Sequence, residues 1–362
     1  MVFVNLLEDP IETAEALIAQ GKADEAARSL RARLEAGRGG LLARITLVKA
    51  LLAAGDVPAA LAQAREAVSL NPNVAPAVLA LGEALLAADL LPTAIAELQR
   101  TLRLDPGLER ARQLVAAAWL KAGEADKALE ALRDLDDPPP EMIVAAEAIK
   151  AAPRSDPGYV RHLFDQFSAD YDDRMIGQLA YAAPQILLDL AAMVMPDAGN
   201  LAILDLGCGT GLAGLAFRPL AARLDGVDLS PAMIEKARER KIGARRIYDN
   251  LMVADLEAAL SALGTDYDLI LAADTLVYLG DLSRTFEAAH ARLRPDGFFL
   301  FTVEKAHREG FELGPKRRWR HSEAYLRALA GRAGLRVAGL VAATSRHEAG
   351  EPVDGFAVAL AR

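Results

Sequence analysis

The chain has 362 residues, which is enough for about two domains with separate hydrophobic cores. Its net charge of -9 at pH 7 argues against a nucleic-acid ligand, which usually requires a basic surface. The single cysteine, Cys208, excludes an intramolecular disulfide and a cysteine-based metal cluster, and we expect no metal site. No signal sequence opens the chain and no apolar run reaches about 18 residues, so we expect a cytoplasmic protein that does not enter a membrane.

A period of 34 residues runs through the first third of the chain. Three sets of residues recur with this period. The small residues are Gly21, Gly55, Asp89 and Gly123, and the alanines are Ala26, Ala60, Ala94 and Ala128. The prolines are Pro72, Pro106 and Pro140. This pattern resembles the tetratricopeptide repeat, a helix hairpin that buries its inner face only against the next unit. We predict four such hairpins over residues 7–142. The first is atypical, because Arg38 stands where the others have proline.

Prolines delimit the segment that follows the repeats. We predict a closing helix and linker over 143–158 and a second domain over 159–362. After the linker, Leu163, Phe164 and Phe167 have helical spacing, which indicates either an amphipathic helix packed on a sheet or an aromatic cap. We favour the cap, because the segment is similar to the lid that precedes the first strand in many small-molecule methyltransferases. In that family a tyrosine covers the cofactor, and the resemblance gives this role to Tyr171.

An apolar run over 201–206 is predicted to be a buried strand of a parallel sheet, and it leads directly into a glycine-rich turn. Glycine permits positive φ and a close ligand approach, so this turn predicts a ligand crevice at the carboxyl end of an open α/β sheet. Two motifs fit. G-x-G-x-x-G from Gly209 spells the dinucleotide fingerprint but begins past the strand end. D-x-G-x-G-x-G from Asp205 resembles the first motif of Rossmann-like S-adenosylmethionine (SAM) methyltransferases and fits the strand better.

Further strands are predicted at 224–229, 253–256, 268–274 and 297–303, followed by a closing antiparallel pair at 334–343 and 354–360. Acids stand at strand ends, among them Asp228 and Asp255. Each alone could be a structural turn residue, because Asp favours such loops. The methyltransferase resemblance implies that Asp228 accepts the ribose hydroxyls and that Asp255 accepts the adenine amino group. Together these acids favour a nucleoside crevice.

The chain as a whole is similar to SAM-dependent methyltransferases that carry an N-terminal tetratricopeptide array. This resemblance implies an all-α solenoid followed by a Rossmann-like domain with a mostly parallel, seven-stranded sheet. It implies SAM as cofactor, held by Tyr171, Asp205, Gly207, Cys208, Gly209, Asp228, Leu229, Asp255, Leu256 and Ala273. An NAD-dependent enzyme is a distant alternative.

Methyl transfer requires the nucleophile and the methyl group to be held in line, and a base only where the acceptor loses a proton. We take Tyr278, His307 and His321 as candidate catalytic residues, although a lone histidine in a loop is often structural. The basic cluster around Arg318 and Arg320 is most simply a solvated loop. If it borders the acceptor, it favours a carboxylate or a phosphate.

We therefore predict a SAM-dependent methyltransferase that acts on a small-molecule or peptide acceptor, with the repeats recruiting a protein partner or the substrate. The alternative is a repeat-based interaction protein whose SAM-binding domain is regulatory. The intact glycines and acids favour the enzyme. A SAM-binding measurement followed by a methyl-transfer assay separates the two.

Overall fold

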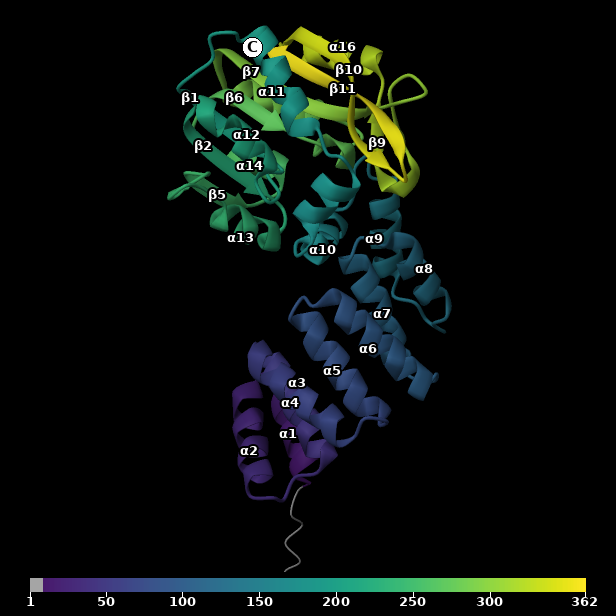
Figure 1. Cartoon of the computed structure of the whole chain (residues 1–362). Coiled ribbons are helices and arrows are strands. Elements are labelled where there is room, and N and C mark those ends of the chain that lie inside the picture. The colour runs from purple at the N-terminus through teal and green to yellow at the C-terminus, as the bar shows by residue number, and fades with distance from the viewer. Residues whose placement is uncertain (1–8) are drawn as a thin grey trace, which may run out of the picture. The chain divides into compact units, whose positions relative to one another are not determined.

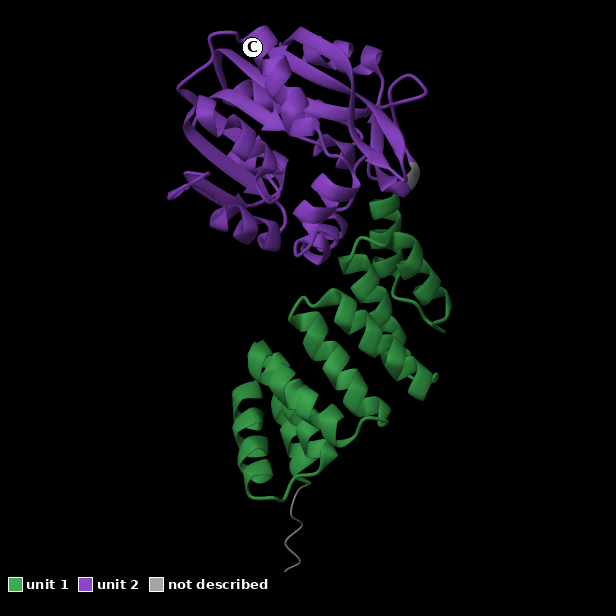
Figure 2. Ribbon diagram, viewed as in Figure 1, with its two compact units in different colours: residues 1–150 green, residues 151–362 purple. Residues whose placement is uncertain are grey.

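The computed structural model describes residues 9–362, so the first two residues of the predicted repeat array, 7 and 8, lie outside the described residues. The chain divides between Lys150 and Ala151 into two compact units, which Figure 2 shows in different colours. This division falls within the stretch 143–158 that we predicted as closing helix and linker. Over the described residues, no helix has the length and apolar character needed to cross a bilayer.

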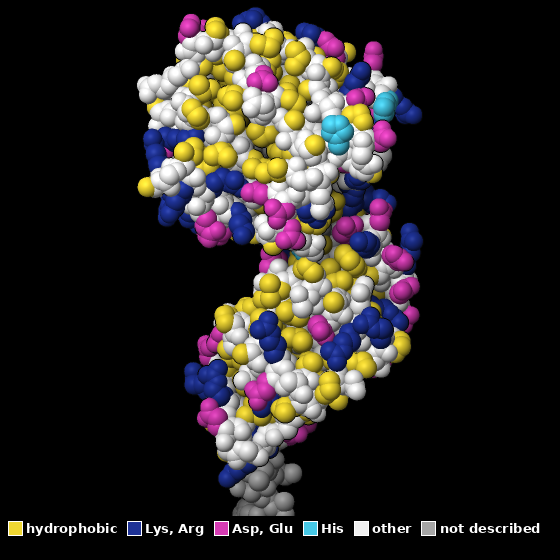
Figure 3. Space-filling model, viewed as in Figure 1, with side chains coloured by type: hydrophobic (Ala, Val, Ile, Leu, Met, Phe, Trp, Pro, Cys, Tyr) yellow, Lys and Arg dark blue, Asp and Glu magenta, His cyan; other side chains and the backbone are white. Residues whose placement is uncertain are grey.

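The described part of the first unit is built from helices. They are α1 (Pro10–Ala19), α2 (Ala23–Glu35), α3 (Leu41–Ala53), α4 (Val57–Leu70), α5 (Ala75–Ala87), α6 (Leu91–Leu104), α7 (Glu109–Lys121), α8 (Ala125–Arg133) and α9 (Pro140–Ala151). Helices α1 to α8 pack as consecutive hairpins, each against the next (Figure 1). On the face drawn in Figure 3, basic and acidic side chains of this unit are interspersed.

The 34-residue period has a direct structural cause. The small residues at its first position form the tight turns within the hairpins, with left-handed φ values of +77° at Gly21, +79° at Gly55, +61° at Asp89 and +68° at Gly123. The alanines five positions later are fully buried, which lets neighbouring helices approach closely: Ala26, Ala60, Ala94 and Ala128. The helical repeat architecture predicted from the sequence is confirmed.

The second unit combines helices with a large sheet. Its helical segments are α10 (Pro157–Phe167), the π-helical η1 (Asp173–Gln178), α11 (Ala183–Val194), α12 (Leu212–Phe217), η2 (Arg218–Leu220), α13 (Pro231–Glu239), α14 (Leu256–Ala262), η3 (Leu276–Tyr278), α15 (Ser283–Arg292), η4 (Pro315–Arg317) and α16 (Glu323–Arg332). Its strands are β1 (Leu201–Leu206), β2 (Ala221–Asp228), β3 (Lys241–Ile242), β4 (Arg245–Arg246), β5 (Asn250–Val253), β6 (Tyr267–Ala272), β7 (Leu293–Lys305), β8 (Phe311–Leu313), β9 (Trp319–His321), β10 (Arg336–Glu348) and β11 (Glu351–Ala361).

The main path of the sheet has the strand order β10-β11-β7-β6-β1-β2-β5. The pairs β1–β2, β1–β6, β2–β5 and β6–β7 are parallel, whereas β11 is antiparallel to both β7 and β10. This is the mostly parallel, seven-stranded arrangement with a closing antiparallel pair that the sequence predicts. From β1 the sheet continues through β2 and β5 on one side and through β6 and β7 on the other. Such a switch in the direction of strand order places a crevice at the carboxyl ends of these strands.

Helices cover both faces of the sheet, because buried strands alternate their apolar side chains between the two faces. Ile203 and Leu269 pack in one core with residues of α11, α12 and α13. Their chain neighbours Leu204 and Ile270 point to the opposite face and pack with α14, α15 and α16. With both faces buried, the edge where the strands end is the part of the sheet left for a ligand.

One stretch differs from the prediction. The segment around Arg318 and Arg320, which we predicted as a solvated loop, contains strand β9, which pairs with β8 and lies parallel to the end of β7 with Arg320 opposite Glu304. These strands are three residues each, which is too short for a period-two pattern of apolar residues to give a strand signal. Their pairing depends instead on the extension of β7 to Lys305.

Candidate functional site

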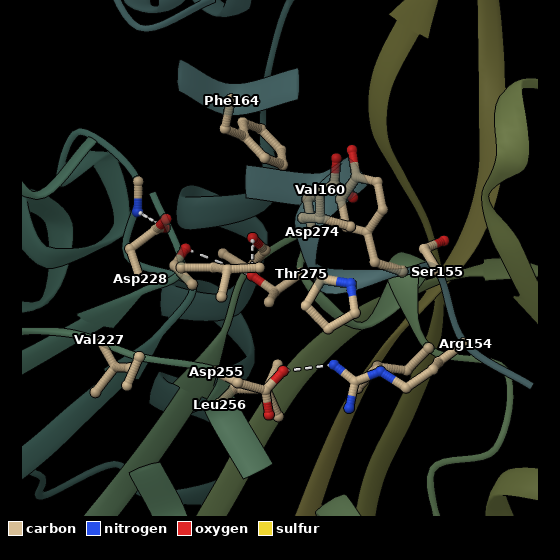
Figure 4. Close-up of a pocket in the computed structure, with 18 of the residues that line it drawn as sticks. Arg154, Ser155, Val160, Phe164, Val227, Asp228, Asp255, Leu256, Asp274 and Thr275 are labelled. Atoms are coloured by element: carbon tan, nitrogen blue, oxygen red, sulfur yellow. Dashed lines mark hydrogen bonds and ion pairs between the residues drawn. The ribbon is translucent and has the colours of Figure 1, made fainter. Parts of the chain in front are cut away.

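A cavity of about 710 Å³, part of it open to solvent and here called the first cavity, lies at the carboxyl ends of the central strands. Figure 4 shows side chains from the segment before α10, from α10 itself and from the ends of β2 and β6 converging on this space. Of the residues predicted to bind a cofactor, those that line it are Tyr171, Gly207, Gly209, Asp228, Leu229, Asp255, Leu256 and Ala273.

The glycine-rich turn forms the floor of the first cavity. Its backbone is anchored to β2, because the N–H groups of Gly207 and Cys208 donate to the carbonyl of Val227 at 2.8 and 3.0 Å. Gly209 has a φ of +53°, and a Cβ built on it would meet only one atom within 4 Å, Tyr171 Cε1 at 3.9 Å. The backbone at Gly209 is therefore open to the cavity, as a close ligand approach requires.

Asp228 is the buried carboxylate that faces the first cavity. Its two oxygens accept hydrogen bonds from the N–H groups of Gly209 and Ser230, both at 2.8 Å. Burial raises the pKa of Asp228 to about 6, against the lowering effect of these hydrogen bonds. Each oxygen keeps a lone pair for a second donor, so the carboxylate is oriented and still able to bind a diol.

Asp205 and Cys208, which we also predicted at the cofactor, do not line the first cavity. The carboxylate of Asp205 is fully buried and accepts the hydroxyl hydrogen of Tyr248 at 2.6 Å, while burial raises its pKa to about 7. The Cys208 side chain is 4% exposed and packs in the core on one side of the sheet. Both side chains are buried beneath the glycine-rich turn, on the side away from the first cavity, and neither faces that cavity.

Asp255 lines the first cavity but already has a partner. One of its oxygens caps α14 by accepting from the N–H groups of Glu257 and Ala258, and the other pairs with Arg154 at 2.5 Å (Figure 4). Arg154 also pairs with Glu257 at 3.1 Å. Arg154 and Ser155 come from the predicted linker, which therefore contributes to the wall of the cavity. Sequence reasoning missed this contribution, because the ion pair joins residues far apart in the chain.

Helix α10 and the residues after it form a lid over the glycine turn. Asp165 accepts a hydrogen bond from the hydroxyl of Ser230 at 2.5 Å, and Asp172 accepts one from the hydroxyl of Thr210 at 2.5 Å. Helix α10 has no fully buried residue. A helix packed on the sheet would bury one face, so its contacts fit a lid better than a core helix.

A second cavity, of about 630 Å³, adjoins the first. The two share Phe164, Tyr171, Asp274 and Tyr278 as lining residues. The ring of Phe164 lies between the two tyrosines, with centroid distances of 6.1 Å to Tyr171 and 5.6 Å to Tyr278. These three rings, together with Asp274, form the boundary between the cavities.

A buried guanidinium fixes the far side of that boundary. Arg346 is 1% exposed and forms ion pairs with Asp274, Glu304 and Glu348. Asp274 also accepts from the hydroxyl of Ser345 at 3.0 Å, and its φ is +58°, a strained value for a residue that is not glycine. The network holds the Asp274 carboxylate in one orientation. Arg346 lies on an ordinary strand pattern, so nothing in the sequence singled it out.

The three predicted catalytic residues are not brought together. Tyr278 lines both cavities. His321 is fully buried, stacks on Tyr325 and contacts the carbonyl of Gly280 at 3.0 Å, and burial lowers its pKa to about 4. His307 lies beside Arg320 and lines neither cavity. Of the three, Tyr278 alone is in position to contact a ligand in these cavities.

The comparisons with known proteins agree with this architecture. Residues 51–118 match the family model for the tetratricopeptide repeat, and residues 204–299 match the family model for a methyltransferase domain. The chain carries tetratricopeptide repeats followed by a methyltransferase domain. This domain has the mostly parallel, Rossmann-like sheet described above.

Three curated relatives are similar over part of the chain. The biotin biosynthesis bifunctional protein BioHC of Saccharophagus degradans is 26% identical over 46% of this chain and 26% of its own length. Human methyltransferase-like protein 27 is 36% identical over 30% of this chain and 44% of its own length. Malonyl-(acyl-carrier protein) O-methyltransferase of Acetivibrio thermocellus is 33% identical over 32% of this chain and 40% of its own length. The chain thus spans less than half the length of these relatives.

Among solved structures, the magnesium protoporphyrin IX methyltransferase of Synechocystis with bound SAH overlaps with 57% of this chain and 99% of its own, at 19% identity and a TM-score of 0.45. The first cavity of the present chain suits SAM by its own features. Asp228 offers a buried carboxylate to a diol, and the open space at Gly209 admits a ligand against the backbone. Among the described residues, no group of three or more His, Cys, Asp or Glu side chains is placed to hold a metal ion.

Proposed function

We propose that the second unit transfers a methyl group from SAM to a small-molecule acceptor, with SAM in the first cavity and the acceptor in the second. The observation that carries this proposal is the shared boundary of the two cavities, formed by Phe164, Tyr171, Asp274 and Tyr278. Methyl transfer requires donor and acceptor on opposite sides of one methyl group, held in line. Two adjoining cavities with a common wall meet that requirement, whereas a purely regulatory SAM domain would need only the first.

The residues of the chain have distinct roles in this function. The Asp228 carboxylate holds the ribose hydroxyls, and the backbone at Gly207 and Gly209 lines the space for the rest of the cofactor. When bound, SAM supplies an electrophilic methyl group on a positively charged sulfur. The rings of Phe164 and Tyr171 exclude water from that group, which prevents its loss to solvent. Tyr278 orients the acceptor through its hydroxyl, which stays protonated because burial raises its pKa.

The repeats are proposed to recruit a protein partner or a peptide-borne acceptor. The tetratricopeptide match supports this role, because such arrays present an extended surface built from successive hairpins. The alternative function, an interaction protein with a regulatory SAM domain, predicts SAM binding without turnover. The second cavity favours the enzyme.

Calorimetric titration of the full chain with SAM tests the cofactor site. Asp228→Asn should weaken SAM binding at least about tenfold, because a charge-assisted hydrogen bond to the ribose contributes about 1.5–3 kcal/mol. Asp268→Asn is the matched control, since Asp268 lies at the opposite end of β6 from the cavity and does not line it. Equal affinity of wild type and Asp228→Asn would remove Asp228 from the site.

Turnover is tested with isotopically labelled SAM and a cell extract that contains both small molecules and proteins. The expected result is a labelled product that depends on wild-type protein and is lost with Asp228→Asn. SAM binding at normal affinity with no labelled product, from either small molecules or proteins of the extract, would favour the regulatory alternative.

A further inference from the structure

The second cavity is mainly a hydrocarbon environment. Its walls include Leu163, Phe167, Met175, Leu179 and Val277, which are apolar along their whole side chains. A molecule that fills it must lose water on most of its surface, which is favourable only for an apolar body. The acceptor is therefore expected to be apolar over most of its length.

The polar end of the cavity is cationic. Arg174, Arg318 and Arg346 line it, and the charge of Arg346 is matched by three carboxylates. The Arg174 guanidinium stacks 4.3 Å from the ring centroid of Phe167, and no ion pair to it is found among residues 9–362. Arg318 pairs with Glu348 and lies 3.8 Å from a carboxylate oxygen of Glu304. An anion at this end would meet the guanidinium groups of Arg174 and Arg318.

This cationic end lies next to the boundary with the first cavity. Burial raises the pKa of the Tyr278 hydroxyl and the charge of the nearby Arg318 guanidinium opposes this rise, while Tyr278 lines both cavities. An anionic group that contacts Arg318 is therefore held close to the place where the methyl group must be presented. The planar guanidinium matches the two oxygens of a carboxylate, so it can fix the direction of one of them.

The second cavity offers no general base. None of its described lining residues is a histidine, lysine or cysteine. Asp274 is engaged by Arg346 and Ser345, and the two tyrosines at the boundary have pKa values raised by burial. An alcohol, amine or phenol would find no group to remove its proton. A nucleophile that arrives already ionised needs none.

We propose that the acceptor is an apolar molecule with a carboxylate, and that a carboxylate oxygen receives the methyl group. The inference rests on the proposed function and adds its substrate class. The carboxylate oxygen forms a bond to the methyl carbon while the carbon–sulfur bond breaks and its electron pair goes to sulfur. The products are a methyl ester and S-adenosylhomocysteine (SAH), and no proton is transferred. Arg318 binds the carboxylate, whereas Arg320 lies outside the cavity, next to Glu304 and His307.

The test uses the full chain and two apolar acids, octanoate and 4-phenylbutyrate. Calorimetry first measures SAH binding, and the SAH-loaded protein is then titrated with each acid and with octylamine and 1-octanol, which share the octyl chain. Protein with SAM and each probe is analysed by mass spectrometry for the methylated product. Arg318→Gln is the test variant. Lys316→Gln is the control, because it removes a cation paired with the same Glu348 but exposed outside the cavity.

We expect at least one acid to bind and to yield its methyl ester, and Arg318→Gln to weaken that binding at least about tenfold with SAH affinity unchanged. Lys316→Gln should bind acid and SAH like the wild type. If Arg318→Gln no longer binds SAH and has therefore lost its fold, Arg174→Gln takes its place with the same expectation.

The outcomes distinguish a failure of the proposed methyltransferase function from a failure of the carboxylate inference alone. A protein that does not bind SAH contradicts the proposed function itself. SAH binding without binding of either acid overturns only the carboxylate inference. So does methylation of octylamine or 1-octanol in preference to the acids, and so does unchanged acid affinity in both arginine variants.

Discussion

Two glycines of the turn region should respond to alanine in opposite ways. Gly214 lies in the first turn of α12, and a Cβ on it would lie 2.3 Å from Tyr248 Oη and 2.5 Å from Cζ of the same ring. The Tyr248 ring is buried, so it cannot move without disturbing its neighbours. At Gly209 the nearest atom to a Cβ is 3.9 Å away, and the methyl group would extend into the first cavity.

The loss of stability in Gly214→Ala is calculated from the displacement of the Tyr248 ring. Overpacking costs about 1–3 kcal/mol, and loss of the hydrogen bond to the buried Asp205 carboxylate costs about 1.5–3 kcal/mol more. The better helix propensity of alanine returns about 1 kcal/mol. We expect a net loss of about 3 kcal/mol, which lowers the melting temperature of a domain of this size by roughly 6–12 °C.

Gly209→Ala should show the reverse pattern. A non-glycine residue at its φ of +53° costs about 1 kcal/mol, so the melting temperature should fall by only about 2–4 °C. Its methyl group occupies cofactor space, so SAM affinity should fall at least about tenfold. Gly214→Ala that remains folded should bind SAM within about threefold of wild type, since Gly214 does not line the cavity.

Thermal unfolding and SAM calorimetry on both variants decide the matter. If Gly209→Ala bound SAM normally, the turn would not be the cofactor floor. If Gly214→Ala lost SAM affinity without losing stability, the assignment of Gly214 to packing would be wrong.

Three further predictions concern pH and chain boundaries. With a pKa of about 6, Asp228 becomes neutral as the pH falls, so SAM affinity should drop by about tenfold between pH 8 and pH 5, and titrations of Asp228→Asn should show a flat profile. Burial lowers the pKa of His321 to about 4, so as the pH falls the unfolded chain takes up the proton first, and the free energy of unfolding should decrease from about pH 6.5 to pH 4. In denaturant titrations His321→Gln should lessen this decrease, and SAM affinity should stay unchanged. A change in SAM affinity would return His321 to the site. Residues 151–362 alone should bind SAM in calorimetry, whereas 158–362, which lacks Arg154, should bind more weakly; equal affinities would show that residues 151–157 are not needed.

Much of the second unit could be predicted because its signals are local. The apolar run at 201–206 and the glycines after it specify a strand and a tight turn within a dozen positions. Since parallel strands end at one edge of a sheet, the acids Asp228 and Asp255 could be placed in one crevice without a structure. The repeat turns were equally accessible, because Gly21 and its equivalents need left-handed φ values.

What the sequence could not supply depends on long-range contacts. Arg154 sits in a proline-bounded segment with no periodic pattern, and its partner Asp255 is 101 residues away. Arg346 is an arginine in a strand, and only the fold shows that three carboxylates surround it. His321 illustrates the opposite error. Because histidine ordinarily titrates near neutral pH, His321 was a candidate for catalysis, but the pairing of β9 with β7 buries its ring.

The repeat turns have a consequence for how the chain can change over evolution. Each hairpin contacts chiefly its immediate neighbours, and each turn residue recurs after 34 residues with the same backbone conformation. Duplication or loss of one whole repeat therefore preserves every interface type, whereas an insertion of any other length breaks the succession of buried alanines. The array can lengthen or shorten in steps of one repeat, so the length of its surface can vary among descendants while the sequence of the second unit stays the same.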